Sequence, residues 1–211
     1  MDIDKKELKE QEIRTMFITP ALNNKGWEVA NNMREEYYFT DGRVIVVGNQ
    51  HSTAEGKKAD YLLYHNGKPI AVVEAKDNKH AVGAGMQQAI DYALILDLKF
   101  AYSSNGDAFL EHDFITGKET ELKLGDFPTE EQLYQRYLAS KDYTDEERNI
   151  IETPCYYDAH SYEPRYYQRI AVDRTVEAIA RGQHRVLVVM ATGTGKTYTA
   201  FQIIHRLHKS G

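Results

Sequence analysis

The stretch ADYLLYHNGKPIAVVEAK, residues 59–76, decides the fold because it contains two apolar runs joined by a turn signal. The first run is Ala59–Tyr64, the second is Lys68–Ala75, and His65-Asn66-Gly67 lies between them. Asparagine and glycine accept the positive φ angles that tight hairpin turns require. The sequence therefore predicts a β-hairpin whose second strand ends in charged residues.

Three charged residues, Asp60, Glu74 and Lys76, lie near the ends of this hairpin. Burying the charges of Glu74 and Lys76 after an apolar strand costs several kcal/mol unless something charged is bound there. A two-residue Asn66-Gly67 turn would pair position 60 with 73 and direct Glu74 away from Asp60. A three-residue loop with Gly67 in the left-handed region pairs 60 with 72 and brings all three side chains to one face. We expect the three-residue loop.

Two carboxylates on one face, here Asp60 and Glu74, can hold Mg²⁺, which prefers oxygen ligands. Lys76 would then orient or help to deprotonate the attacking water and neutralise the pentavalent phosphate. An ordinary surface ion pair at the end of a strand is the alternative, because Glu-x-Lys occurs four times in the sequence. The pattern alone does not separate the two interpretations.

Flanking segments extend the prediction in both directions. Asp41-Gly42, between Tyr37–Phe39 and Val44–Val47, indicates another hairpin. Periodicity and capping signals predict the remaining elements of this half. We expect a helix over Lys5–Phe17, closed by Pro20, and a second helix over about Val82–Asp97. A buried strand at Phe100–Ser103 and a helix from Thr129 to about Ala139 follow.

Gln88 and Tyr92 lie four residues apart, on one face of the helix predicted over 82–97. The combination Asp-x13-Glu-x-Lys followed by Gln-x3-Tyr resembles the PD-(D/E)xK nuclease core found at the N-terminus of type I restriction endonuclease motor subunits. Upstream, Glu12-x-Arg14, Ile18-x-Pro20 and Gly26-Trp27 resemble the opening helix of that family. The resemblance covers roughly the first hundred residues, and Ala59 replaces the proline of the motif.

The resemblance implies roles for individual residues. Asp60 and Glu74 would be metal ligands, Lys76 would be catalytic, and Gln88 and Tyr92 would be active-site and DNA-positioning residues. An acidic residue from the opening helix also belongs to the family pattern. Glu12 is the first candidate for it, and Glu35 and Glu36 compete for the role.

The chain changes character after Lys141. Residues 141–164 are rich in Asp, Glu and Tyr, contain Pro154 and Pro164, and show no sustained period, which indicates a linker. Beyond it we expect a helix over about Arg165–Ala180, a strand at Arg185–Met190, a glycine turn and a final helix. This is only the first βα unit of a parallel α/β domain.

The turn ATGTGKT, residues 191–197, resembles motif I of superfamily 2 helicases, in which the place taken here by Met190 need not be glycine. Backbone N–H groups and the helix N-terminus would converge on ATP phosphates, with Lys196 on the β/γ-phosphates and Thr197 on Mg²⁺. Upstream, Arg165-Tyr166-Tyr167-Gln168 resembles the segment whose glutamine reads adenine, the alternative being a solvated helix start. The expected ATP-binding residues are Gln168, Gly193, Thr194, Gly195, Lys196 and Thr197. With no acidic motif II, ATP should bind weakly without hydrolysis.

Composition limits the class of protein. The 211 residues carry a net charge of −6, which excludes a uniformly basic nucleic-acid coat. No apolar run of about 18 residues indicates a membrane span, and the charged N-terminus excludes a secretory signal. The single Cys155 fits a cytoplasmic location, and no Cys/His cluster has zinc-ligand spacing.

The combined prediction is an α/β chain: a PD-(D/E)xK nuclease domain with a mixed sheet flanked by helices, residues 1–140, a linker, residues 141–164, and the start of a RecA-like phosphate-loop domain, residues 165–211. The resemblance implies an R subunit that cleaves double-stranded DNA with Mg²⁺, couples cleavage to ATP-driven translocation, and assembles with methylation and specificity subunits. Two alternatives stay open. One is another helicase–nuclease fusion of phage defence or repair, and the other is an ATP-binding module with a non-cleaving DNA-binding or assembly domain.

Overall fold

The computed structural model describes residues 4–40, 44–47, 50–53, 56–158 and 164–211. The chain divides into two compact units, Met1–Ser140 and Lys141–Gly211. Within the described ranges, no helix is both long and apolar enough to cross a membrane.

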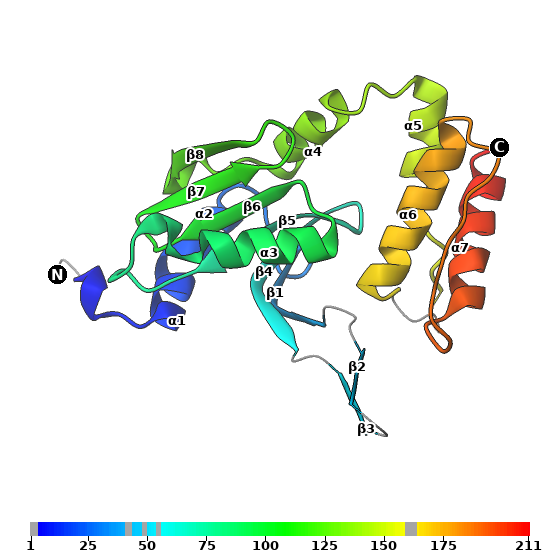
Figure 1. The fold of residues 1–211 in the computed structure, drawn as a ribbon. Coiled ribbons are helices and arrows are strands. Elements are labelled where there is room, and N and C mark those ends of the chain that lie inside the picture. The colour runs from blue at the N-terminus through cyan, green and yellow to red at the C-terminus, as the bar shows by residue number, and fades with distance from the viewer. Residues whose placement is uncertain (1–3, 41–43, 48–49, 54–55, 159–163) are drawn as a thin grey trace. The chain divides into compact units, whose positions relative to one another are not determined.

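A six-stranded sheet forms the centre of the first unit, with the strand order β1-β4-β5-β6-β7-β8 (Figure 1). The strands are β1 (Met33–Phe39), β4 (Lys57–His65), β5 (Lys68–Ala75), β6 (Phe100–Ser104), β7 (Ala108–Asp113) and β8 (Lys118–Lys123). Only β5 and β6 pair in parallel, and helix α3 (Met86–Leu96) makes the crossover between them. The remaining neighbours pair antiparallel.

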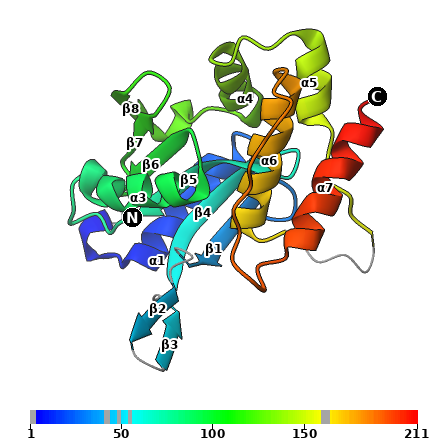
Figure 2. The same ribbon diagram turned by 45° about the vertical axis from the view of Figure 1, so that its right-hand side comes forward.

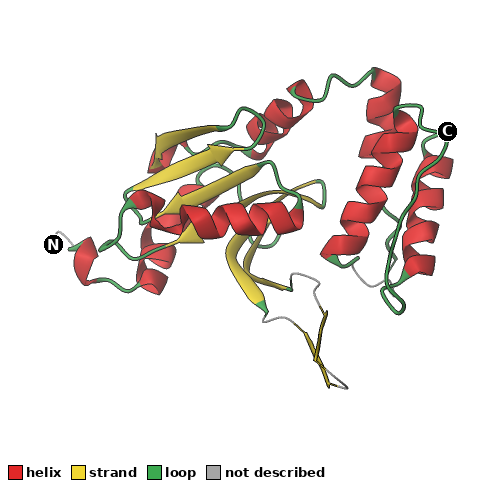
Figure 3. Ribbon diagram, viewed as in Figure 1, coloured by secondary structure: helices red, strands yellow, loops and turns green. Residues whose placement is uncertain are grey.

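Helices cover both faces of the sheet (Figure 3). On one face, α3 packs against β5 and β6. The other face carries α1 (Glu10–Ile13), α2 (Thr19–Asn23) and α4 (Glu130–Ala139), whose apolar residues join the main core with Trp27 and Phe127. A mixed sheet flanked by helices is the fold predicted for this half, so the prediction is confirmed. The helices predicted near 82–97 and 129–139 and the strand at 100–103 are confirmed as well.

Two short one-turn 3₁₀ segments, Val82–Gly85 and Leu124–Asp126, lead into α3 and α4, and a third, Lys5–Glu7, precedes α1. Thr129 caps α4, because its side chain accepts from Gln132 N while Gln132 Oε1 accepts from Thr129 N at 2.9 Å. This is the capping box predicted from the sequence. It fixes where α4 starts on the sheet.

The helix expected over Lys5–Phe17 does not end at Pro20. A π-helical turn, Arg14–Ile18, follows α1, and α2 then continues through Pro20. Proline lacks the N–H that would bond back to the preceding turn, and its ring crowds the carbonyl four residues earlier. The wider π turn takes up this mismatch, so the helical path bends onward instead of stopping.

The hairpin predicted between Tyr37–Phe39 and Val44–Val47 is wrong. β1 pairs with β4, while β2 (Val44–Val47) pairs with β3 (Gln50–Thr53) in a separate two-stranded sheet. The Asp41-Gly42 turn signal lies outside the described residues. Pairing with β4 buries Met33 and Phe39 at the two ends of β1, which an isolated hairpin cannot do.

The central hairpin forms with the two-residue turn, but the pairing near Asp60 differs from both registers considered above. His65 pairs with Lys68 across a two-residue turn in which Asn66 and Gly67 have φ of 47° and 76°. Further along, the register shifts, so that Leu63 pairs with Ala71 and Tyr61 with Val73. A bulge at Ile70 accounts for the shift, because it adds one residue to β5. The expected three-residue loop is therefore wrong, although Asp60 and Glu74 still share a face.

The second unit contains three helices: α5 (Asp145–Glu152), α6 (Tyr166–Ala180) and α7 (Lys196–Lys209). α6 packs against both α5 and α7, and the two views show it beside them (Figures 1 and 2). The segment interpreted as a linker thus includes α5. Arg206, 1% exposed, joins the three helices through Asp173 Oδ1 and the Ile151 carbonyl, both at 2.5 Å.

The strand expected at Arg185–Met190 is not a strand. Leu187 and Val189 are 88% and 85% exposed. A buried parallel strand needs neighbours that supply hydrogen bonds and cover both faces. The described part of the second unit contains helices and connections and no strand. The backbone of this apolar run therefore has no neighbouring strand with which to pair.

Candidate active site

Asp60, Glu74 and Lys76 come together where β4 begins and β5 ends. Beyond the Tyr61–Val73 pair, the shifted register brings Asp60 opposite Glu74, and Asp60 N donates to Glu74 Oε1 at 3.3 Å. Asp60 Oδ2 accepts from Ala75 N at 2.9 Å. Paired residues share a face of a sheet, so the two carboxylates point to the same side.

Glu74 is the most deeply buried member of this group, with 1% of its side chain exposed. Burial, reinforced by the charge of Asp60, raises the pKa of Glu74 to about 8, against the opposing effect of Lys76. Glu74 Oε2 is buried and accepts no hydrogen bond. A buried carboxylate oxygen that accepts no hydrogen bond and lies beside a second carboxylate suits a small cation.

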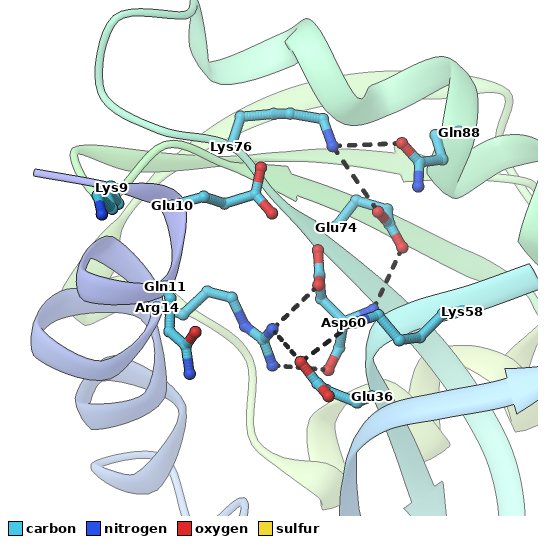
Figure 4. A pocket seen from close by; sticks show the side chains of 10 residues that line it. All are labelled: Lys9, Glu10, Gln11, Arg14, Glu36, Lys58, Asp60, Glu74, Lys76 and Gln88. Atoms are coloured by element: carbon cyan, nitrogen blue, oxygen red, sulfur yellow. Dashed lines mark hydrogen bonds and ion pairs between the residues drawn. The ribbon is translucent and has the colours of Figure 1, made fainter.

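Lys76 connects the carboxylates to α3. Its Nζ lies 3.9 Å from Glu74 Oε2 and donates to Gln88 Oε1 at 3.2 Å (Figure 4). Gln88 Nε2 donates to Tyr92 Oη at 3.0 Å. Burial raises the pKa of Tyr92, and the charges of Glu74 and Asp60 add to the effect. All five residues expected from the sequence therefore belong to one connected group.

A cavity of about 380 Å³ opens over this group. It is lined by Lys9, Glu10, Gln11, Arg14, Glu36, Lys58, Asp60, Glu74, Lys76 and Gln88. Tyr92 does not line the cavity but accepts the hydrogen bond from Gln88. Its ring packs edge-on against Phe39. The N-terminal helical segment faces α3 across the cavity (Figure 4).

The three acidic candidates for assisting the site occupy different places. Glu12 Oε2 accepts from Lys9 N at 2.8 Å and caps its own helix. Glu35 accepts from Thr19 Oγ1 at 3.2 Å and does not line the cavity. Glu36 lines the cavity, with Oε1 3.1 Å from both Arg14 Nη1 and Lys58 Nζ. Of the three, Glu36 is therefore the one that lies at the cavity.

Sequence reasoning gave no site role to six residues of the site, which are Lys9, Glu10, Gln11, Arg14, Lys58 and Gly85. The Glu10 carboxylate points into the cavity (Figure 4). Glu10 and Arg14 are four residues apart, a helical spacing that indicates a shared face and was the available signal. At Gly85, a Cβ would lie 3.0 Å from Ser103 Oγ and 3.2 Å from Glu74 Cβ. Glycine there allows α3 to start directly against the carboxylate strand.

Across the described ranges, no group of three or more His, Cys, Asp or Glu side chains is arranged to hold a metal ion. A cation at this site would therefore take its protein ligands from Asp60 and Glu74. Mg²⁺ fits such a donor set, since it commonly keeps several waters and uses one or two carboxylates.

The phosphate loop of the second unit precedes α7. Gly193 and Gly195 have φ of 79° and 84°, which favour glycine. Lys196 and Thr197 are exposed at the first turn of α7, and Lys196 Nζ donates to Met190 O at 3.1 Å. Gln168 Nε2 donates to Thr194 O at 2.9 Å. Gln168 therefore contacts the glycine loop, although the two are 26 residues apart in the sequence.

Comparisons with known proteins match the two regions in which these sites lie. Residues 46–120 match the family model for the type I restriction enzyme R protein N terminus, and residues 161–211 match the model for the type III restriction enzyme res subunit. The first match includes Asp60, Glu74, Lys76, Gln88 and Tyr92, and the second includes Gln168 and the phosphate loop.

The chain is also similar to curated and solved proteins. It is 45% identical over 99% of its length to the type I restriction enzyme EcoAI endonuclease subunit of Escherichia coli, and 26% identical over 96% to the EcoKI endonuclease subunit of Escherichia coli strain K12. It spans 26% and 22% of those proteins. A fragment structure of an HsdR subunit of a type I restriction enzyme from Vibrio vulnificus YJ016 superimposes with a TM-score of 0.80, at 45% identity, over 96% of this chain and 38% of that one. Together with the two family models, these likenesses show that the chain belongs to the type I restriction enzyme R subunits and corresponds to their N-terminal part.

Proposed function

We propose that the first unit is the Mg²⁺-dependent DNA-cleaving domain of a type I restriction enzyme R subunit. The observation that carries the proposal is the paired carboxylates Asp60 and Glu74, buried beside Lys76, with Glu74 Oε2 accepting no hydrogen bond. The substrate would be double-stranded DNA, and methylation and specificity subunits would select the site. Membership of the family supports both partners.

The side chains divide the work of phosphodiester hydrolysis. Asp60 and Glu74 would hold the cation. When bound, Mg²⁺ would supply positive charge to the phosphate oxygens as negative charge develops. The Lys76 ammonium, held by Gln88, would orient the attacking water and neutralise the phosphate. Tyr92 would keep Gln88 in place through their hydrogen bond. Lys9 and Lys58, which line the cavity, would contribute positive charge for the DNA phosphates.

Nicking of supercoiled plasmid in Mg²⁺ by the R subunit assembled with its methylation and specificity subunits tests this proposal, and the same assay without those subunits separates it from the alternatives. Asp60→Asn removes one cation ligand, so we expect cleavage to fall below detection while the protein stays folded by circular dichroism. The matched control is Asp126→Asn, an exposed aspartate outside the cavity, which should cleave like wild type.

Other outcomes point to the alternatives. DNA binding without cleavage by the wild-type protein would favour a non-cleaving DNA-binding or assembly domain. Cleavage that survives Asp60→Asn would contradict the proposed site. Cleavage that needs Asp60 but neither methylation nor specificity subunits would favour another helicase–nuclease fusion.

For the second unit, we propose that residues 191–197 bind the phosphates of ATP and belong to the motor that translocates DNA. The support is the glycine loop at the start of the 14-residue helix α7, with Lys196 and Thr197 exposed beside it. The Gln168 side chain donates to Thr194 O and accepts from Arg165 N. Its second amide hydrogen and the other lone pair of its oxygen would then hydrogen-bond to adenine.

Calorimetric titration with ATP tests the loop. Lys196→Ala should weaken ATP binding about tenfold or more, because it removes the charge that faces the phosphates. Lys209→Ala, at the other end of α7, is the matched control and should bind ATP like wild type. Equal affinities in wild type and Lys196→Ala would contradict the proposal.

A further inference from the structure

A partly buried arginine, Arg14, contacts one of the two site carboxylates. Arg14 has 11% of its side chain exposed, and its Nη1 lies 3.3 Å from Asp60 Oδ1 and 3.1 Å from Glu36 Oε1. Its Nη2 donates to the Asp60 carbonyl oxygen at 3.5 Å. The guanidinium therefore contacts both the side chain and the backbone of Asp60.

Two backbone irregularities bring this contact about. Arg14 opens the π-helical turn Arg14–Ile18, a rare geometry that is frequent at functional sites. Glu36 has a φ of 51° within strand β1, between residues paired with Tyr61 and Ala59. A non-glycine residue in the left-handed region costs about 1 kcal/mol or more, so other contacts must stabilise it. The first segment carries Arg14, which contacts Asp60, and the second carries Glu36, which contacts Arg14.

Arg14 also contacts Tyr61, the residue that follows Asp60 in β4. Its Nε lies 3.5 Å from Tyr61 Oη, and its guanidinium carbon lies 5.1 Å from the centre of the Tyr61 ring. Tyr61 is fully buried and belongs to the core, and its hydroxyl pairs with Thr19 Oγ1 at 2.9 Å. The guanidinium thus lies between a rigid aromatic support and the carboxylate.

We propose that Arg14 is a positioning residue, which holds Asp60 in the orientation that lets Asp60 and Glu74 bind a hard divalent cation together. Glu36 in turn holds Arg14. With Oδ1 fixed by Arg14 and Oδ2 fixed by Ala75 N, the Asp60 carboxylate cannot rotate away from Glu74. The inference rests on the proposed function only in requiring that this pair of carboxylates binds a cation.

Outer partners of this kind contribute strongly to metal sites, and removing one typically costs about 10–100-fold in metal affinity or activity. Arg14→Gln should therefore weaken Mn²⁺ and Mg²⁺ binding to the DNA-free protein by about this factor, measured by isothermal titration calorimetry. Arg14→Lys keeps the charge but loses the planar fork of donors, so its affinity should fall between the two. Excess Mg²⁺ should restore much of the cleavage rate of Arg14→Gln.

Arg34→Gln is the matched control. Arg34 is exposed on β1, and its guanidinium carbon lies 5.4 Å from the centre of the Tyr64 ring. Like Arg14→Gln, this variant removes an arginine from the face of a tyrosine ring. Arg34 does not line the cavity that contains the carboxylates. Its cation affinity should equal that of wild type. Should Arg14→Gln fail to fold, Glu36→Gln loosens Arg14 from the exposed side, and we expect about a threefold to tenfold loss.

The outcomes separate this inference from the proposed function. If wild type binds no cation, the proposed metal site fails and the inference fails with it. If wild type binds the cation, and folded Arg14→Gln and Glu36→Gln bind it equally well or more tightly, only the inference is overturned, because Arg14 would then be neutral or a competitor of the cation.

Discussion

The carboxylate site of the first unit draws its side chains from distant parts of the chain, whereas the phosphate loop of the second unit lies mostly within one short stretch. Residues from the N-terminal helical segment, β1, the β4–β5 hairpin and α3 line the first site. In the loop, two left-handed glycines and the start of α7 provide the geometry locally, and Gln168 adds a contact from elsewhere in the chain. A site assembled from distant segments depends on the whole sheet, and a local loop can form beside an unpaired apolar run.

The largest expected effect is in the carboxylate site. Lys76→Ala should lower the rate of DNA cleavage by about 10³-fold or more, because it removes the ammonium from a desolvated site. Lys79→Ala, an exposed lysine three residues further on, is the matched control. Single-turnover cleavage rates compare them. Loss of the folded state in Lys76→Ala would instead favour a structural ion pair, and full activity would show that Lys76 takes no part in catalysis.

Glu74 provides the next largest effect, on stability in metal-free buffer. Its folded pKa of about 8 lies above the ordinary value of 4.5, so the folded state binds the proton more tightly than the unfolded state. The cost of the buried charge is absent below pH 4.5, grows as the pH rises, and is complete above pH 8. Glu74→Gln should remove this loss and stabilise the protein at pH 9 by about 1–3 kcal/mol relative to wild type.

Urea unfolding at pH 5 and pH 9 measures this difference. Wild type and Glu74→Gln should be close in stability at pH 5 and separate at pH 9. Equal pH dependence in the two proteins would show that Glu74 is ionised without penalty in the folded state.

Gly85 tests how closely α3 must approach the carboxylate strand. Gly85→Ala places a Cβ 3.0 Å from Ser103 Oγ and 3.2 Å from Glu74 Cβ, so the strand or the helix has to move by a few tenths of an ångström. We expect about 1–2 kcal/mol of destabilisation and about tenfold slower cleavage. Gly125→Ala, where a Cβ would meet nothing within 4 Å, is the control. An unchanged cleavage rate would show that the site tolerates this displacement.

The smallest effect should come from the apolar run of the second unit. Leu187→Asn changes an 88% exposed side chain on unpaired backbone, so unfolding free energy should change by no more than about 0.5 kcal/mol. Hydrogen exchange should be fast at Arg185–Met190 and slow at Ala71–Glu74, which lies in the centre of the sheet. Equal protection in the two segments would show that the second unit is already a cooperative strand-containing domain.

Much of the site was predictable because its signals are local. Asp60, Glu74 and Lys76 adjoin an apolar hairpin, and Gln88 and Tyr92 have helical spacing, so their types and order could be read directly. Arg14 shares a helical face with Glu10, but that spacing does not reveal its contact with Asp60, and no local signal marks Gly85. An arginine on a helix is ordinarily a solvated residue, and only the close approach of α3 shows why position 85 is glycine.

Strand pairing was the part that local signals misjudged. Asp41-Gly42 between apolar runs favoured a hairpin, yet β1 pairs with β4, because burial of its ends against the core outweighs the turn preference. The same limit applies to Arg185–Met190, where a strand-like composition does not form a strand without partners. β-structure depends on what lies beside each segment, and sequence periodicity does not report that neighbour.

The sequence by itself determined which residues are candidates for the chemistry, where the helices α3, α4, α6 and α7 lie, and that a glycine loop precedes the last helix. Only the tertiary structure decided the register at the site. The turn at Asn66-Gly67 has two residues, and the bulge at Ile70 supplies the extra step that brings Asp60 opposite Glu74. Since a one-residue shift moves every side chain of a strand to the other face, packing of both faces of the sheet, and not the turn, selects the register that joins the two carboxylates.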